Sequence, residues 1–348
     1  MRAHHVKLRA TRTLIVCASL MWLAGCFGDP SLKRFENYHE RLARSLKQSA
    51  HEAAPVAPPL RPARRELTVA PSDQRIGLIA FLKLYDCSLW QVIGERNSAL
   101  GKVASASQQL FMELDFLRLA PECVATLQAR GEDALARSLA DAHALKLDEL
   151  PIRIWQATLA SEEFESLWYV PIALGDYEPS ADLPLEDALN TVAHWSALWL
   201  DGDYRYDATA FEVALGRIRH GNAGFWLRAA ALTESQLSAA SQTAHDRVAR
   251  RPLCFNGMTN QQGNILLNVV QKFFVSDVQV WAAEYNRVLY RVLQPHAKLE
   301  ILLRAVWPAA YRDWVADRDT QLDAINRTAR AHVAAVEPLL RSCSLLPK

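Results

Sequence analysis

The sequence is poor in the residues and motifs that mark several large protein classes. It has only 13 glycines among 348 residues, which argues against a β architecture rich in turns. It contains no glycine-rich phosphate loop and no G-x-S-x-G motif, so it offers neither a nucleotide fingerprint nor a recognisable serine nucleophile. The C-x-x-C and H-x-x-x-H spacings of common metal sites are also missing. We therefore expect no metal, no other cofactor and no assignable catalytic residue.

The sequence also lacks an excess of positive or negative charge. The chain has 39 basic and 38 acidic residues, a formal net charge of +1. This balance does not suggest a nucleic-acid partner. Half of the residues are hydrophobic, as expected of a folded globular protein. Beyond the N-terminus, no apolar run is long enough to cross a bilayer, so we expect a body outside the membrane.

The N-terminus has the layout of an export signal. An apolar run over residues 14–24 follows a basic segment that contains Arg2, Lys7, Arg9 and Arg12. The run is about half of the roughly 20 residues that a membrane-spanning helix needs. It ends in Leu23-Ala24-Gly25-Cys26, which resembles the lipobox of bacterial lipoproteins. The sequence therefore predicts a signal peptide over residues 1–25.

The lipobox resemblance implies a lipid on Cys26, cleavage before it and acylation of the freed amine. Three acyl chains would make dissociation from a membrane negligible. Phe27 is not the aspartate that usually marks inner-membrane retention, so we expect the periplasmic face of the outer membrane rather than the inner one. Removing four basic residues with the signal turns the formal charge from +1 to −3. The alternatives are an ordinary signal peptide with a coincidental cysteine, or a chance apolar segment.

Four of the six cysteines remain once Cys17 leaves with the signal and Cys26 is lipidated. An even number in an oxidising compartment suggests two disulfides. Of the three possible connectivities we favour Cys87 with Cys123 and Cys254 with Cys343, because each pair then lies within one half of the chain. The alternative is four buried free thiols.

Residues 26–71 are expected to precede a separate helical domain over residues 72–348. Residues 31–52 show a basic, amphipathic helical pattern. This helix could lie on anionic headgroups, but docking on the protein's own core is favoured. Residues 53–71 contain five prolines and predict an extended spacer.

From residue 72 onward helical spacing of apolar residues dominates, with no internal repeat, and it predicts an all-α, irregular multi-helix bundle. Pro121 and Pro151 are expected to disturb their helices. A loop is expected over residues 168–184 because the apolar pattern is lost there. The expected helical blocks cover residues 73–97, 105–124, 133–160, 185–200, 208–218, 224–250, 260–293 and 308–341.

Two polar stretches are candidate binding sites. The first is Glu95, Arg96, Asn97 and Ser98, where Glu95 and Arg96 could bind a ligand or act as a general base with its orienting group. Capping at a helix end explains the same residues and is favoured. The second is an amide-rich stretch after Cys254, whose paired donors and acceptors suit sugars or peptide backbones. A loop that leads into a helix cap is the favoured explanation. The amide candidates are Asn256, Asn260 and Gln262, with Gln261 and Asn264 beside them.

Two further patterns receive a structural interpretation. Residues 201–212 imitate a calcium loop, but Arg205 stands where an oxygen ligand belongs and Tyr206 where the turn demands glycine. An inter-helix turn is favoured instead. A group of aromatic residues could line a groove, but helical spacing makes core packing the favoured interpretation. That group is His194, Trp195, Trp199, Phe225 and Trp226.

Several segments together resemble an uncharacterised family of Gram-negative lipoproteins that carry a domain of unknown function. The resemblance implies lipoprotein status and no activity. The leading hypothesis is an anchored, non-enzymatic scaffold or binding module for a periplasmic protein, peptidoglycan or lipid. The alternative is a hydrolase of cell-wall or lipid substrates with Glu95 as acid or base. The segments are Leu23-Ala24-Gly25-Cys26, Arg75-Ile76-Gly77-Leu78, Asp86-Cys87, Glu95-Arg96-Asn97-Ser98, Leu100-Gly101-Lys102 and Ala120-Pro121-Glu122-Cys123.

Overall fold

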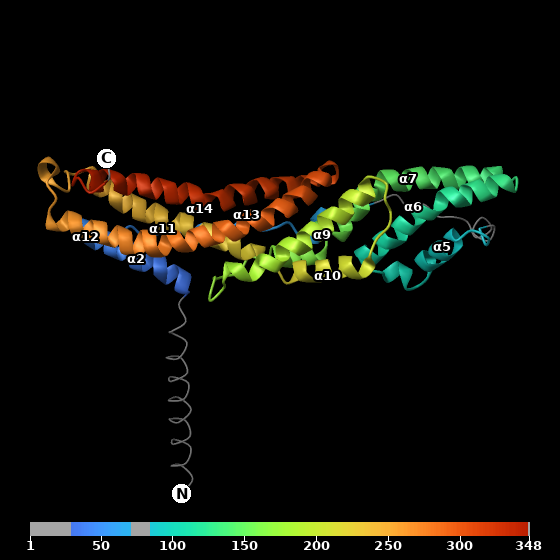
Figure 1. Cartoon of the computed structure of the whole chain (residues 1–348), viewed down its shortest axis with the longest axis horizontal. Helices are drawn as coiled ribbons and strands as arrows, with labels where there is room; N and C mark the ends of the chain where they lie inside the picture. Colours follow the sequence, from blue (N-terminus) through green and yellow to red (C-terminus); the bar gives the residue numbers. More distant parts are fainter. Residues whose placement is uncertain (1–28, 71–83, 347–348) are drawn as a thin grey trace, which may run out of the picture.

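The structure is a computed structural model that describes residues 29–70 and 84–346. Within these ranges the chain forms helices and connecting segments without a β-strand, which confirms the expected all-α fold. Figure 1 shows an elongated body with α5, α6 and α7 at one end and α2, α11, α12 and α14 at the other. Helices α9 and α10 lie between the two ends. The signal segment and Cys26 lie outside the described residues, as do residues 71–83.

Most long helices follow the predicted blocks, with two exceptions. Of the helix expected over residues 73–97, residues 84–88 are turns and only α5 from Leu89 onward is helical, while residues 73–83 lie outside the described residues. The helix expected over residues 260–293 contains a π-helical middle, η4 (Val270–Val278), and continues past Pro295 to Leu302. The long helices are α2 (Pro30–Leu46), α5 (Leu89–Asn97), α6 (Ala106–Ala129), α7 (Asp133–Ala157), α9 (Leu183–Leu200), α10 (Ala208–Arg219), α11 (Ala223–Val248), α12 (Gln261–Val269), α13 (Gln279–Leu302) and α14 (Ala309–Arg341). The short segments are α3 (Arg64–Leu67), η1 (Gly101–Val103), α8 (Glu162–Leu167), η2 (Pro179–Asp182), η3 (Phe255–Gly257) and η5 (Arg304–Val306).

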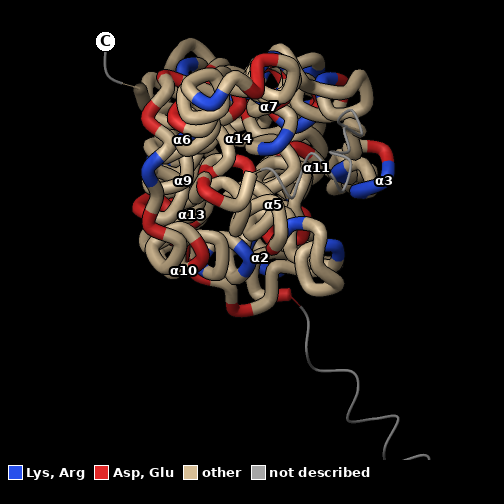
Figure 2. The backbone as a smooth tube through the Cα atoms, turned by 90° about the vertical axis from the view of Figure 1, so that its right-hand side faces the viewer, with Lys and Arg blue, Asp and Glu red and all other residues tan. Residues whose placement is uncertain are grey.

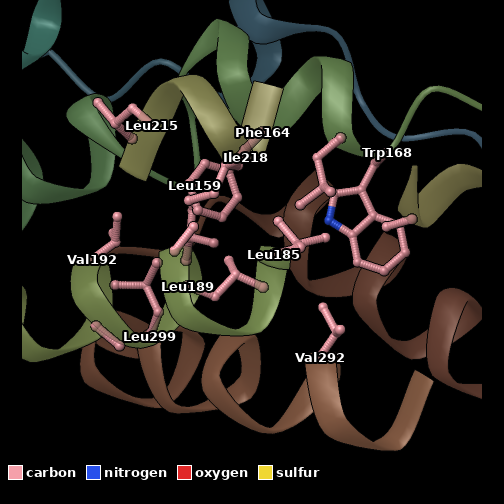
Figure 3. Packing of buried hydrophobic residues seen from close by; sticks show 14 of the residues in the cluster. Leu159, Phe164, Trp168, Leu185, Leu189, Val192, Leu215, Ile218, Val292 and Leu299 are labelled. Carbon is pink, nitrogen blue, oxygen red and sulfur yellow. The ribbon is translucent and has the colours of Figure 1, made fainter. Parts of the chain in front are cut away.

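Buried apolar side chains form three clusters. The largest joins α6–α11 to α13 and α14, and Figure 3 shows part of it, where Leu185 and Leu189 of α9 face Ile218 of α10. A second cluster joins α2 to α11, α12 and α14, and a third joins α5 to α6 and α7. Charged residues of both signs are interspersed along the backbone in the end-on view of Figure 2. The buried apolar faces therefore define the fold.

Helix α2 begins at an N-cap in which Asp29 Oδ1 accepts a hydrogen bond from Ser31 N at 2.9 Å. Its apolar stripe packs into the second cluster through Phe35, Tyr38 and Leu42. The helix ends at Leu46, six residues before the expected end, because Lys47 takes a left-handed conformation. Helix α2 thus docks on the core, which is the alternative that the sequence favoured.

The proline-rich stretch after α2 is extended, but it lies along the body instead of standing free as a spacer. The Ser235 hydroxyl donates to the carbonyl of Ala54 at 2.7 Å. The indole of Trp155 donates to the carbonyl of Leu67 at 2.8 Å, and both residues are buried. These contacts come from helices far along the chain and could not be read from the local composition.

The prediction that Pro121 and Pro151 interrupt their helices is wrong, because α6 and α7 continue past these prolines. A proline in a helix leaves the carbonyl four residues earlier without its partner. For Pro121 that carbonyl belongs to Leu117, and it lies 3.2 Å from His143 Nε2 of α7. A neighbouring helix therefore replaces the bond that the proline removes.

Both disulfides have the connectivity that the sequence favoured. Cys87 pairs with Cys123 between the segment before α5 and helix α6. Cys254 pairs with Cys343 and ties the segment before η3 to the end of α14. Gly263 packs against the second bridge so closely that a Cβ there would lie 2.8 Å from Cys343 Sγ. Each bridge thus closes one end of the elongated body.

Candidate functional site

A pocket of about 450 Å³ lies between the start of α9 and the end of α10. This volume falls within the usual range of small-molecule sites. Its wall is mostly apolar, with Leu185 and Pro184 from α9 and Val213 from α10. The lining residues are Ala181, Asp182, Pro184, Leu185, Val213, Gly216, Arg217, His220 and Gly221.

Close packing behind the pocket holds its two helices in place. Leu185 and Ile218 are buried in the largest core cluster, one from each helix. At Gly221 an added Cβ would lie 2.7 Å from Leu167 Cδ1 and 2.8 Å from Leu185 Cδ2. A larger side chain at this turn after α10 would therefore require Leu167 and Leu185 to shift.

Asp182 is a buried carboxylate in the pocket wall. The Tyr177 hydroxyl donates to its Oδ2, and Asn222 Nδ2 donates to its Oδ1 at 3.2 Å. The Trp226 indole donates in turn to the Tyr177 hydroxyl at 3.1 Å. Burial raises the pKa of the Asp182 carboxyl, although the bonds from Tyr177 and Asn222 lower it in part. Both carboxylate oxygens have partners, so Asp182 braces the wall and is not a free base.

The edge of the pocket carries the groups that a ligand can meet. Arg217 and His220 are exposed and lie one turn apart near the end of α10. Val213 lies one turn before Arg217 and is half exposed. A guanidinium beside an apolar wall suits a ligand with an apolar part and an anionic group. The arrangement can bind, but these residues form no nucleophile-and-base pair.

An aromatic contact links the pocket wall to the buried Tyr285 of α13. The ring centroids of Tyr177 and Tyr285 lie 6.0 Å apart. Burial raises the pKa of the Tyr285 hydroxyl, and the charges of Asp29 and Asp182 raise it further. Tyr285 therefore lies within electrostatic reach of both the N-cap of α2 and the pocket wall.

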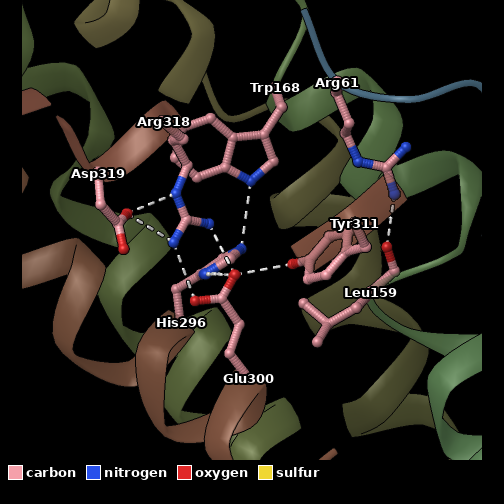
Figure 4. Close-up of polar contacts among 8 residues, drawn as sticks. All are labelled: Arg61, Leu159, Trp168, His296, Glu300, Tyr311, Arg318 and Asp319. Atoms are coloured by element: carbon pink, nitrogen blue, oxygen red, sulfur yellow. Dashed lines mark hydrogen bonds and ion pairs between the residues drawn. The ribbon is translucent and has the colours of Figure 1, made fainter. Parts of the chain in front are cut away.

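A second polar cluster, drawn in Figure 4, lies inside the largest core. Arg318 binds Glu300 through both Nη atoms, at 2.7 and 3.0 Å. Tyr311 donates to Glu300 at 2.8 Å, and His296 Nδ1 lies 3.4 Å from it. Burial alone would raise the pKa of the Glu300 carboxyl, but His296 and Arg318 lower it well below its ordinary value. All four side chains are buried, so a ligand can reach them only if the helices separate.

A third cluster joins three cations to the buried Glu113 of α6. Arg96 of α5 and Arg153 of α7 lie 3.0 and 3.7 Å from Glu113 Oε1, and Lys146 of α7 pairs with Oε2. Burial lowers the pKa of both Lys146 and Arg153, although the Glu113 charge raises each in part. This network holds α5 against α6 and α7.

The first predicted site is a helix end in the structure. Asn97 is the last residue of α5, and the Ser98 hydroxyl accepts a bond from Gly101 N at 3.0 Å. Arg96 pairs with Glu113, while Glu95 is exposed. The structure does not bring Glu95 and Arg96 together as a pair, and the capping interpretation accounts for the segment.

The amide-rich residues do not converge on one site either. Asn260 caps α12 by accepting from Gly263 N at 2.8 Å, as the favoured interpretation expected. Gln262 donates to the carbonyl of Ser45 at the end of α2, at 2.9 Å. Asn256 is exposed, with a left-handed backbone in η3. The first two residues therefore stabilise local structure.

The calcium-like stretch is an inter-helix connection, as favoured. Arg205 binds Asp203 at 2.6 Å, and Asp207 caps α10. Within residues 29–70 and 84–346, no group of three or more metal-ligating side chains could hold an ion. No helix in the same ranges is long and apolar enough to cross a membrane.

The aromatic group is divided between core and surface. Trp199 and Trp226 are buried, Trp195 is packed at the core edge, and His194 is exposed. Sequence reasoning missed Asp182, Arg217 and His220. The signal that could have indicated them is a lone aspartate between prolines, together with a basic pair at a helix end beside glycine. Only packing shows that these two segments meet.

Comparisons with known proteins place the chain in a family without giving it an activity. No curated protein and no solved structure matches it. The family model described as "Protein of unknown function (DUF3080)" matches residues 35–347. That match covers α2 from Phe35 onward and every later helix of the described structure, so the chain belongs to this family of unknown function.

Proposed function

We propose that the chain is an envelope lipoprotein whose lipid on Cys26 holds a non-enzymatic binding module at a membrane surface. The binding site is the pocket between α9 and α10. Its ligand is an amphiphile with a short acyl chain and an anionic group.

Two features of the chain support the anchor. Leu23-Ala24-Gly25-Cys26 follows a basic segment and a short apolar run, the order that lipoprotein signals have. The remaining four cysteines form two disulfides, which suits a chain that folds in an oxidising compartment.

The observation that carries the binding role is the chemistry of the pocket. Its wall is mostly apolar, both oxygens of its buried carboxylate already accept hydrogen bonds, and the exposed Arg217 lines it. An acyl chain can cover the apolar wall while its carboxylate pairs with Arg217. A neutral polar ligand would leave the apolar wall in contact with water.

Isothermal calorimetry with dodecanoate tests the binding role. Val213→Trp should fill the pocket and abolish binding. Val280→Trp is the matched control, because Val280 is also an exposed helical valine, 58 % against 50 % for Val213, and does not line the pocket. Arg217→Gln should weaken dodecanoate binding about tenfold, since a hydrogen bond to a charged group contributes about 1.5 kcal/mol.

Dodecanol, which lacks the carboxylate, distinguishes binding by the apolar wall from binding by Arg217. It should bind more weakly than dodecanoate, and Arg217→Gln should not weaken it further. Equal dodecanoate binding by wild type and Val213→Trp would contradict the assignment of the pocket.

A further inference from the structure

The connection between α8 and η2 exposes two large side chains. Ile172 is 92 % exposed and Tyr169 is 69 % exposed, although the flanking Trp168 and Leu174 are buried. Burying such apolar surface is favourable, so the exposure of these two side chains calls for an explanation. We call residues 169–173 the Ile172 loop.

The Ile172 loop is fixed at three points, so its exposure is a feature of the fold. Arg228 Nε donates to the carbonyl of Pro171 at 2.8 Å. Gly224 lies so close to Tyr169 that an added Cβ would be 1.9 Å from its carbonyl oxygen. Leu174 N donates to Asp29 Oδ2 at 2.9 Å.

The last of these contacts places the loop beside the start of α2. Figure 1 shows the connection before α9 reaching the same lower edge of the body as the N-terminal end of α2. Both Figure 1 and Figure 2 also place α2 and α10 toward this edge. The Ile172 loop, the start of α2 and α10 therefore share one side of the molecule.

The position of Cys26 in the sequence indicates that this side of the molecule faces a bilayer. Only three residue steps separate Cys26 from Asp29, and three extended residues span at most about 10–11 Å. A lipid on Cys26 therefore keeps Asp29 within that distance of the bilayer surface, and the Ile172 loop is held next to Asp29 through Leu174. This step rests on the proposed function.

We propose that the Ile172 loop inserts Ile172 and Tyr169 into the interface of the bilayer that holds the Cys26 lipid. Isoleucine supplies apolar surface, and tyrosine suits the boundary where one end of a side chain is apolar and the other is hydrated. The lipid and the loop then make two contacts with one bilayer. Two contacts fix the side that faces the membrane, whereas a lipid alone lets the body rotate.

The test uses the lipidated full chain in vesicles of phosphatidylethanolamine and phosphatidylglycerol. Ile172→Cys carries an environment-sensitive fluorophore, and nitroxide groups are placed on the lipids near the headgroup boundary. Ile301→Cys is the matched control, because Ile301 is 71 % exposed and lies at the end of α13, whose junction with α14 is at the upper edge in Figure 1.

We expect a severalfold loss of fluorescence and a blue shift at position 172, with little change at position 301. Side chains in membrane-surface contacts lie about 5–10 Å into the headgroup region. A Tyr169→Ser change in the labelled chain should reduce quenching at position 172, because it removes the second side chain of the contact.

The two claims fail differently. If the chain co-sediments with vesicles but position 172 is quenched no more than position 301, the loop contact is overturned and the anchor stands. If the exported chain carries no lipid on Cys26, the proposed anchor is overturned and the loop contact with it.

Discussion

The backbone N–H of Leu174 donates a hydrogen bond to the Asp29 carboxylate, with 2.9 Å between Leu174 N and Asp29 Oδ2. The other carboxylate oxygen accepts from Ser31 N at the start of α2. One side chain thus caps the first described helix and ties it to a segment 145 residues away. A lipid three residues before Asp29 would be held against the body through this contact.

Asp29→Ala should lower the free energy of unfolding by about 1 kcal/mol, the usual loss when an N-cap is removed. It should also speed hydrogen exchange at the Leu174 amide, because that N–H loses its acceptor. Denaturant unfolding and exchange measured on the same sample give the two results. Asp29→Asn keeps one side-chain oxygen, so its free energy of unfolding should lie between those of the wild type and Asp29→Ala. An unchanged Leu174 exchange rate in Asp29→Ala would contradict this account.

Glu300→Gln should destabilise the protein by about 3–5 kcal/mol, because it removes the buried charge that pairs with Arg318 and leaves only Asp319, whose side chain is 56 % exposed. Glu337→Gln is the control. Glu337 pairs with Arg341 on the surface of α14, and exposed pairs contribute about 0–1 kcal/mol. Chemical denaturation measures both changes. Equal loss of stability in the two variants would contradict the claim that the buried Glu300–Arg318 pair contributes more than an exposed pair.

The stability should fall on acidification through His332. Its ring lies between Tyr38 Oη at 2.5 Å and Ser241 Oγ at 3.0 Å. Burial, together with the nearby His39 and His245, lowers the pKa of His332 from 6.5 to about 3. Below pH 6.5 the unfolded chain binds a proton that the folded chain rejects until about pH 3, so acid favours unfolding across that window.

The expected slope from this group is about 1.4 kcal/mol per pH unit. It is best measured above pH 4.5, the ordinary pKa of a glutamate, because fewer carboxyl groups titrate there. His332→Gln removes the titration and should give a shallower dependence of unfolding free energy on pH between 4.5 and 6.5. Parallel curves for wild type and variant would rule out His332 as a source of the slope.

Replacing both Cys254 and Cys343 by serine should destabilise the protein more than replacing Cys87 and Cys123. The Cys254–Cys343 bridge spans 89 residues and the Cys87–Cys123 bridge 36, which corresponds to about 5 and about 4 kcal/mol in the chain-entropy model. Denaturant midpoints of the two double variants provide the comparison. The reverse order would contradict the loop-closure argument.

The helices were predictable because their apolar residues recur with helical spacing, a local property that survives without knowledge of the neighbours. The effect of Pro121 was not, because the His143 side chain that lies against the freed Leu117 carbonyl comes from another helix. The path of the proline-rich stretch was hidden for the same reason. Its composition predicts an extended chain, but the groups that bind it lie on other helices.

In the candidate site, too, local features were predictable and contacts between distant segments were not. Arg96 was noticed as a polar residue at a helix end, yet its partner Glu113 depends on how α5 packs against α6. The pocket is formed by residues 181–185 and 213–221, two segments that neither share a motif nor lie side by side in the sequence. Sequence patterns give residues and local elements, and packing decides which of them meet.

Mass spectrometry of the chain exported by a Gram-negative host tests the central claim, attachment through Cys26. The account predicts an N-terminal peptide that begins at Cys26 and carries a diacylglyceryl thioether and an acylated amine. A peptide that still contains residues before Cys26, or an unmodified thiol at that position, would contradict it.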